Sequence, residues 1–147
     1  MNFLNEMHLK IPALSINESF ARGVVAAFCV SINPTLEEIN DLKTAVSEAV
    51  TNCVVHGYKD KSGDVEIWAG LTENEIYIEI KDFGVGIEDT EVAMQPFFTT
   101  KPDEERSGMG FTVMQTFMDS VTVSSKKGEG TTVKMQKKFE KKEEQNA

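Results

Sequence analysis

The chain has little of what marks several common classes of protein. Its 147 residues include two cysteines, Cys29 and Cys53, both at apolar positions of helical patterns. This usage predicts buried free thiols rather than a disulfide framework or a zinc site. No stretch approaches the roughly 20 apolar residues of a membrane span, and no basic segment followed by an apolar run opens the sequence. We therefore expect a cytoplasmic protein with no membrane role.

Positive charge is also scarce. Lysine and arginine number 15 against 24 aspartates and glutamates, which gives a formal net charge of -9 and a pI near 4.7. Such a surface repels polyanions, so direct nucleic-acid binding and anionic membranes are disfavoured and a basic partner suits it better. The Gly-x-x-x-x-Gly-Lys-Ser/Thr signature is missing, which excludes a P-loop nucleotide site.

The length fits one domain, which we place at 1–139, followed by a charged tail at 140–147 that we expect to be disordered. Alternating segments predict five strands, at 7–11, 65–68, 76–80, 121–124 and 131–135. Helical spacing predicts three helices, from 17 to about 32, from 35 to 57 and from 111 to 118. Because strands and helices are interleaved, helices layered on a sheet are expected.

Capping signals bound the first two helices. Ser15 or Asn17 can cap the first helix, and Thr35 with Glu38 forms a capping box at the start of the second. Gly57 follows the last periodic turn of that second helix, where a glycine in the left-handed conformation would end it.

Glu48 and Asn52 form the first candidate site. They are four residues apart on the second helix, so both side chains share one face beside its apolar stripe. An amide oxygen is a suitable ligand for Mg²⁺, and a carboxylate can accept a proton from an attacking hydroxyl. Taken alone, the pair fits a solvated helix face better than a site, because glutamate and asparagine at this spacing are common.

The second candidate site is Asp82-Phe83-Gly84-Val85-Gly86, directly after a predicted strand. The aspartate can accept a hydrogen bond from the exocyclic amine of adenine, where guanine has a carbonyl. The glycines allow the backbone to approach a ligand closely. The alternative is a glycine-rich turn with an ordinary aspartate at its start.

Further along, residues 96–110 read as a long loop, of a length that is commonly functional. It ends in Arg106-Ser107-Gly108-Met109-Gly110, whose glycines open a helix with free N–H groups that favour phosphate. Gly128-Glu129-Gly130-Thr131 then enters the last strand and, by itself, is a hairpin turn. The order of these motifs is more specific than any one of them.

That order resembles the GHKL superfamily of ATP-binding domains, with Glu48 to Asn52 as its N box, Asp82 to Gly86 as its G1 box and Ser107 to Gly110 as its G2 box. The resemblance implies an α+β fold, a two-layer sandwich with helices on one face of a mixed, mainly antiparallel sheet. Within that superfamily, the segments Asn17 to Arg22 and Phe98 to Pro102 are similar to those of one family, the sporulation anti-sigma factors of bacilli.

Members of that family are homodimeric serine kinases that hold sigma factor F inactive and phosphorylate an anti-anti-sigma factor. The resemblance implies ATP or ADP and Mg²⁺ as cofactors, with Glu48 as general base and Asn52 as the Mg²⁺ ligand. It implies nucleotide contacts from Asp82, Gly84, Gly86, Thr99, Thr100, Lys101, Ser107, Gly108, Gly110 and Thr131. Arg106 would offer charge to the γ-phosphate, and Glu18 and Arg22 would dock the protein partners.

Two alternatives stay open within the same fold. One is the general-stress anti-sigma kinase, whose motifs are similar. The other is an ATP-hydrolysing module, because Glu48 could activate water instead of serine.

Overall fold

The computed structural model describes residues 2–59, 61–87 and 110–140. Along the chain, these residues form β1 (Asn5–Pro12), α1 (Asn17–Cys29), a 3₁₀ turn (Val30–Ile32), α2 (Leu36–Asn52), a π-helical turn (Cys53–Gly57), β2 (Asp64–Leu71), β3 (Glu75–Asp82), α4 (Gly110–Phe117), β4 (Ser120–Lys126) and β5 (Gly130–Lys138). The expected strands and helices are therefore confirmed, each within a few residues of its predicted bounds.

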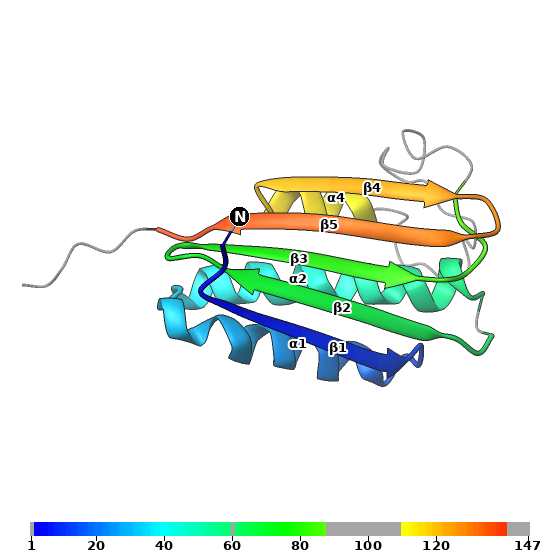
Figure 1. Cartoon of the computed structure of the whole chain (residues 1–147), viewed down its shortest axis with the longest axis horizontal. Helices are drawn as coiled ribbons and strands as arrows, with labels where there is room; N and C mark the ends of the chain where they lie inside the picture. Colours follow the sequence, from blue (N-terminus) through cyan, green and yellow to red (C-terminus); the bar gives the residue numbers. More distant parts are fainter. Residues whose placement is uncertain (1, 60, 88–109, 141–147) are drawn as a thin grey trace, which may run out of the picture.

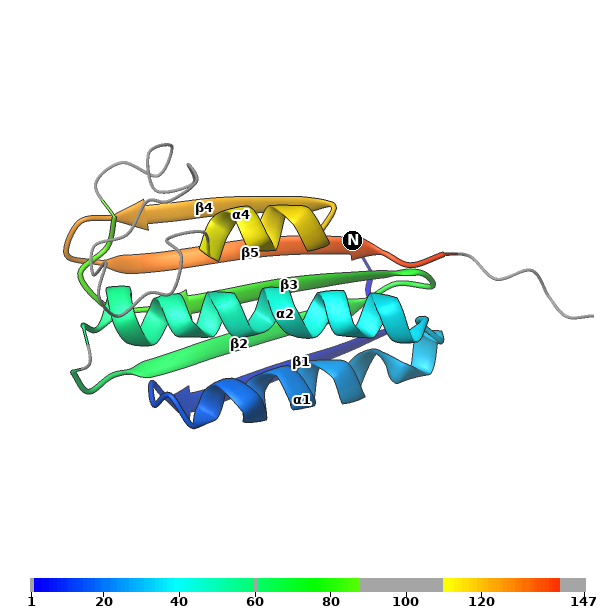
Figure 2. The same cartoon turned by 180° about the vertical axis from the view of Figure 1, so that it is seen from behind.

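The strands form one sheet in the order β1-β2-β3-β5-β4, and each of its four described pairings is antiparallel. Helices α1, α2 and α4 all cover the same face of this sheet (Figures 1 and 2). This is the expected α+β two-layer sandwich. The strand β1 lies at one edge of the sheet.

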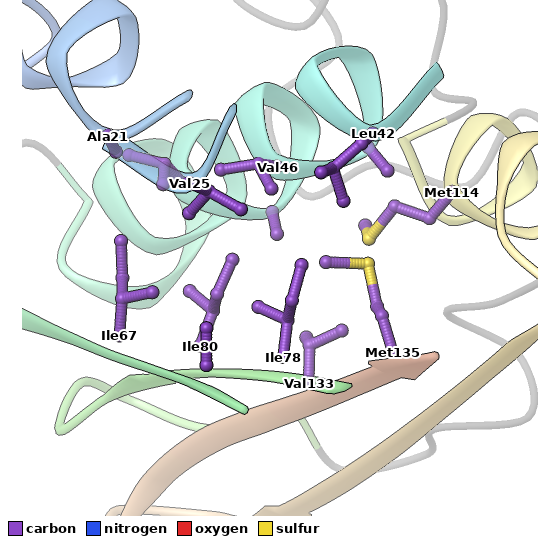
Figure 3. Close-up of a cluster of buried hydrophobic side chains, with 14 of the residues drawn as sticks. Ala21, Val25, Leu42, Val46, Ile67, Ile78, Ile80, Met114, Val133 and Met135 are labelled. Carbon is purple, nitrogen blue, oxygen red and sulfur yellow. The ribbon is translucent and has the colours of Figure 1, made fainter. Parts of the chain in front are cut away.

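The core lies between the helices and the covered face of the sheet (Figure 3). Leu42 and Val46 of α2 point toward Ile78 and Ile80 of β3, and all four side chains are fully buried. Burying each such side chain contributes about 1.5–3 kcal/mol. Because these residues recur at helical spacing on α2 and at alternate positions on β3, their other faces are left for polar side chains.

Helix starts confirm one capping prediction and correct another. The Thr35 side chain accepts from the Glu38 backbone N–H, and the Glu38 carboxylate accepts from the Thr35 N–H, which completes the predicted box. At α1 the N-cap is Ile16, with no side-chain cap, so the prediction of Ser15 or Asn17 was wrong. The side-chain amide of Asn17 instead donates a hydrogen bond to the backbone carbonyl of Pro12, at the end of β1.

The predicted ending of α2 was also wrong. The helix runs into the π-helical turn, and Gly57 is not among the glycines with positive φ. A glycine is needed here for space, because a Cβ on Gly57 would lie 2.7 Å from the Asp82 carboxylate.

Cys29 and Cys53 are buried free thiols, as predicted. No helix within the described ranges is long and apolar enough to span a membrane.

Candidate nucleotide-binding site

The C-terminal ends of α2 and β3 and the start of β5 lie at the same end of the molecule (Figure 1). The last residue of β3, Asp82, pairs with Thr131 at the start of β5. The C-terminal end of α2 lies over the same end of the sheet (Figure 1). The π-helical turn after α2 brings Cys53 and Gly57 against the Asp82 side chain. The sequence motifs around Asn52, Asp82 and Thr131 are thus brought to one place.

The Asp82 carboxylate is the most unusual polar group of this region. Its residue is only 3% exposed. Oδ1 accepts from the Gly84 N–H at 2.9 Å, and the Cys53 thiol and the Thr131 backbone amide also donate to the carboxylate. Burial raises the pKa of Asp82 above its ordinary value, and these three donors offset part of that rise. A carboxylate has about four acceptor positions, so Asp82 can also accept from a ligand that donates a hydrogen bond.

Cys53 is a site residue that its apolar position in the sequence did not reveal. Burial, and then the neighbouring Asp82 carboxylate, raise the pKa of its thiol well above the ordinary value. The thiol therefore keeps its proton and remains a donor to Asp82. The sequence predicted the burial of this cysteine but gave no sign of its contact.

Close backbone packing explains the first glycine of the Asp-x-Gly-x-Gly motif. A Cβ on Gly84 would lie 1.9 Å from the Gly57 carbonyl oxygen, which also accepts from the Val85 N–H at 2.9 Å. Gly86 has φ +77° and lies against the Lys126 carbonyl. The motif therefore makes an Asx-type turn and also buries its carboxylate, while the reading of adenine by Asp82 stays a prediction.

Replacing Gly84 by alanine is expected to destabilise the fold by roughly 1–3 kcal/mol, because backbone atoms on both sides must shift to admit the methyl group. Thermal unfolding of the purified variant measures this. Gly23→Ala is the matched control, since nothing lies within 4 Å of its Cβ position, and it should stabilise α1 by about 0.5–1 kcal/mol. Equal melting temperatures for the two variants would contradict the close approach.

Two hydroxyl groups hold the loop that follows Asp82. The Tyr58 hydroxyl accepts from the Phe83 N–H at 2.8 Å and donates to the Asp64 carbonyl at 2.6 Å. The Ser125 hydroxyl accepts from the Ile87 N–H at 2.7 Å and contacts the Thr131 hydroxyl at 2.8 Å. Neither Tyr58 nor Ser125 was among the site residues predicted from the sequence.

Glu48 and Asn52 are half-buried residues on the last two turns of α2, as expected for positions beside an apolar stripe. Asn52 directly precedes Cys53, so the chain brings it next to the residue that contacts Asp82. Among the described residues, no three His, Cys, Asp or Glu side chains cluster as a metal site.

Gly110 is the buried first residue of α4, which begins at the same end of the molecule as the Asp82 turn (Figure 2). The other candidates of this loop lie outside the described residues: Thr99, Thr100, Lys101, Arg106, Ser107 and Gly108.

The candidate docking residues Glu18 and Arg22 lie on α1, with side chains 35% and 41% exposed, and form an ion pair at 3.8 Å. Ile16, which directly precedes α1, and Phe20, in its first turn, are 79% and 53% exposed. This end of α1 thus presents both charge and apolar surface to solvent.

Comparison with known proteins defines the class. The histidine kinase-like ATPase domain family matches residues 11–137. The chain is also similar to the solved structure of the RsbU and RsbW domains of a Mycobacterium tuberculosis protein, with a TM-score of 0.67. The match covers 92% of this chain and 32% of that one. Because the two sequences are only 18% identical, this similarity concerns the fold alone. The chain therefore belongs to the histidine kinase-like ATPase domain family and has a fold like that of the solved structure.

Curated relatives are more specific. The anti-sigma F factor of Thermoanaerobacter sp. (strain X514) is 59% identical over 137 residues, which cover 93% of this chain and 96% of that protein. The anti-sigma F factor of Bacillus velezensis is 52% identical over 138 residues, covering 93% of this chain and 94% of that protein. The chain belongs to the anti-sigma F factor family.

Proposed function

We propose that this chain binds and inhibits sigma factor F and, with Mg²⁺ and ATP, phosphorylates an anti-anti-sigma factor on serine. The observation that carries the nucleotide-binding part is the buried Asp82 carboxylate, which lies against the turn that follows α2. The names of its relatives support sigma factor F as the protein that this chain inhibits, and they favour this family over the general-stress anti-sigma kinase.

Adenine recognition is assigned to Asp82. Its carboxylate accepts from the exocyclic amine, whereas a guanine carbonyl there would place two acceptors against each other inside a buried site. Thr131 supports this end of the site from β5, where its hydroxyl is bonded to Ser125. Gly84 and Gly86 keep the backbone close enough to form the wall of the site.

The chemistry is assigned to the α2 face. Mg²⁺-ATP supplies the phosphoryl group and the charge neutralisation for its transfer. Asn52 provides an amide oxygen for the ion, and Glu48 accepts the proton of the serine hydroxyl as that oxygen takes the phosphoryl group. Gly110 lies at the start of α4, and the phosphate contacts of Thr99, Thr100, Lys101, Arg106, Ser107 and Gly108 remain predictions from the sequence.

Partner docking is assigned to the exposed end of α1. Glu18 and Arg22 provide both signs of charge, and the exposed Phe20 on the same helix provides an apolar contact. If the sigma factor and the anti-anti-sigma factor share this surface, they compete for it. The edge strand β1 is the proposed homodimer contact, because its outer side carries unpaired backbone groups within the described sheet. We take 1–139 as the single domain that performs these functions.

Transcription in vitro tests the inhibitory part of this proposal. RNA polymerase carrying sigma factor F should lose activity on a promoter that depends on it when the chain and ATP are added in stoichiometric amounts. Addition of the unphosphorylated anti-anti-sigma factor should restore transcription. Unchanged transcription at a large excess of the chain would rule out the inhibitory role.

Arg22→Ala is expected to weaken binding of both protein partners roughly 10- to 100-fold, since charged interface residues that lose their partner cost about 2 kcal/mol or more. ATP affinity should stay within twofold, because Arg22 lies on α1. Titration of labelled sigma factor F measures the first effect and calorimetry with ATP the second. An unchanged affinity for the sigma factor would remove Arg22 from the docking surface.

A further inference from the structure

The exposed end of α1 is held to α2 by two hydroxyl groups. The Thr51 hydroxyl donates to Glu18 Oε2 at 3.0 Å. Arg22 Nη1 donates to the Ser47 hydroxyl at 3.4 Å. Each member of the Glu18–Arg22 ion pair therefore has its own neutral partner on the other helix, and neither hydroxyl had been singled out by the sequence.

These hydroxyl groups occupy the helix that also carries the catalytic candidates. Ser47 and Thr51 are four residues apart, as are Glu48 and Asn52. One residue along an α-helix is a rotation of about 100°, so the two pairs occupy adjacent faces of the same two turns. One face contacts α1, and the next carries the residues assigned to Mg²⁺ and the base.

The ion pair alone is poorly suited to fix the two docking side chains. Its atoms are 3.8 Å apart and both side chains are partly exposed, and such surface pairs hold long side chains only weakly. Ser47 is 8% exposed and Thr51 is half-buried, and these short side chains have less conformational freedom than the two long charged ones. Bonds to these hydroxyls restrict Glu18 and Arg22 before any partner arrives, which lowers the ordering cost of docking.

We propose that Ser47 and Thr51 are positioning residues for partner docking, which hold Arg22 and Glu18 in the geometry that the sigma factor and the anti-anti-sigma factor recognise. The proposal rests on the assignment of Glu18 and Arg22 as docking residues. Ser47 and Thr51 act through those two side chains.

A double-mutant cycle tests this. Thr51→Val removes the hydroxyl with little change of shape and should weaken binding of sigma factor F about five- to tenfold, while Thr51→Ser keeps the wild-type affinity. For phosphorylation, Thr51→Val should raise KM for the anti-anti-sigma factor by a similar factor with kcat unchanged. In the Glu18→Ala background, Thr51→Val should have no further effect, because its bonding partner is gone.

Thr44→Val is the matched control, since the Thr44 hydroxyl is exposed on the same helix and bonds only to the Asn40 carbonyl among the contacts described. It should leave affinity for the sigma factor unchanged. The cycle of Ser47→Ala with Arg22→Ala is an independent second test, and thermal unfolding of every variant shows that it is folded.

The outcomes separate the inference from the proposal beneath it. If Glu18→Ala and Arg22→Ala leave affinity for the sigma factor unchanged, the docking assignment fails and this inference fails with it. If those variants bind weakly but Thr51→Val and Ser47→Ala bind normally, only the positioning role is refuted. An equal loss from Thr51→Val with and without Glu18 would also refute it.

Discussion

Glu48→Gln is expected to slow phosphoryl transfer to the anti-anti-sigma factor roughly 10²- to 10⁴-fold, the usual contribution of a general base. The amide keeps the shape and the hydrogen-bonding reach of the side chain but cannot take the serine proton at neutral pH. Affinities for ATP and for sigma factor F should remain within about twofold, because Asp82 and the α1 surface are unchanged. Initial rates of transfer at saturating ATP measure the effect.

Glu37→Gln provides the control for this substitution. Glu37 is an exposed residue in the first turn of the same helix, so the change alters charge on α2 far from its C-terminal end. It should leave the rate within about twofold. A Glu48→Gln protein that phosphorylates at the wild-type rate would refute the assignment of the base.

Asp82→Asn is expected to weaken ATP binding roughly 10- to 150-fold, since a hydrogen bond to a charged group contributes about 1.5–3 kcal/mol. The carboxylate accepts from Gly84, Cys53 and Thr131, so an amide nitrogen placed in the same position must face either one of these donors or the adenine amine. Affinity for GTP should change little, which removes the preference for adenine. Calorimetry with both nucleotides measures this.

Asp64→Asn is the control for the change of carboxylate to amide. Asp64 begins β2 with its side chain 48% exposed, 3.7 Å from the Lys10 ammonium, and its substitution should leave ATP affinity unchanged.

The pH dependence of ATP binding gives a second check on Asp82. Because burial raises the pKa of Asp82, ATP affinity of the wild type should fall as the pH decreases through that raised pKa, and the Asp82→Asn variant should lack that part of the dependence.

The sequence predicted the fold well because its signals are local. Periods of 3.6 and 2 residues identified the helices and strands, and the capping box at Thr35 identified the start of α2 to the residue. The end of α2 was misread because Gly57 has two possible uses. A glycine after a helix commonly adopts positive φ, but here it gives room to a carboxylate that is distant in sequence.

The candidate site was predicted less completely. Asp82 and Thr131 were identified from motif order, and the structure pairs them across β3 and β5. Cys53, Ser125 and Thr51 were missed because their roles depend on contacts with segments far along the chain, and small polar or apolar residues on amphipathic elements carry no local sign of such contacts. Tertiary contacts of this kind are set by the folded arrangement of the chain and not by any local pattern in the sequence.

The central claim is that the face of α2 beside Asp82 directs phosphate from ATP to a serine. The most direct measurement is to incubate the chain with Mg²⁺, ATP labelled in its γ-phosphate and the anti-anti-sigma factor, and then to identify the labelled product. Label on serine of the anti-anti-sigma factor, lost in the Glu48→Gln protein, is the predicted result. Label on histidine, label released only as free phosphate, or no turnover of ATP would contradict it.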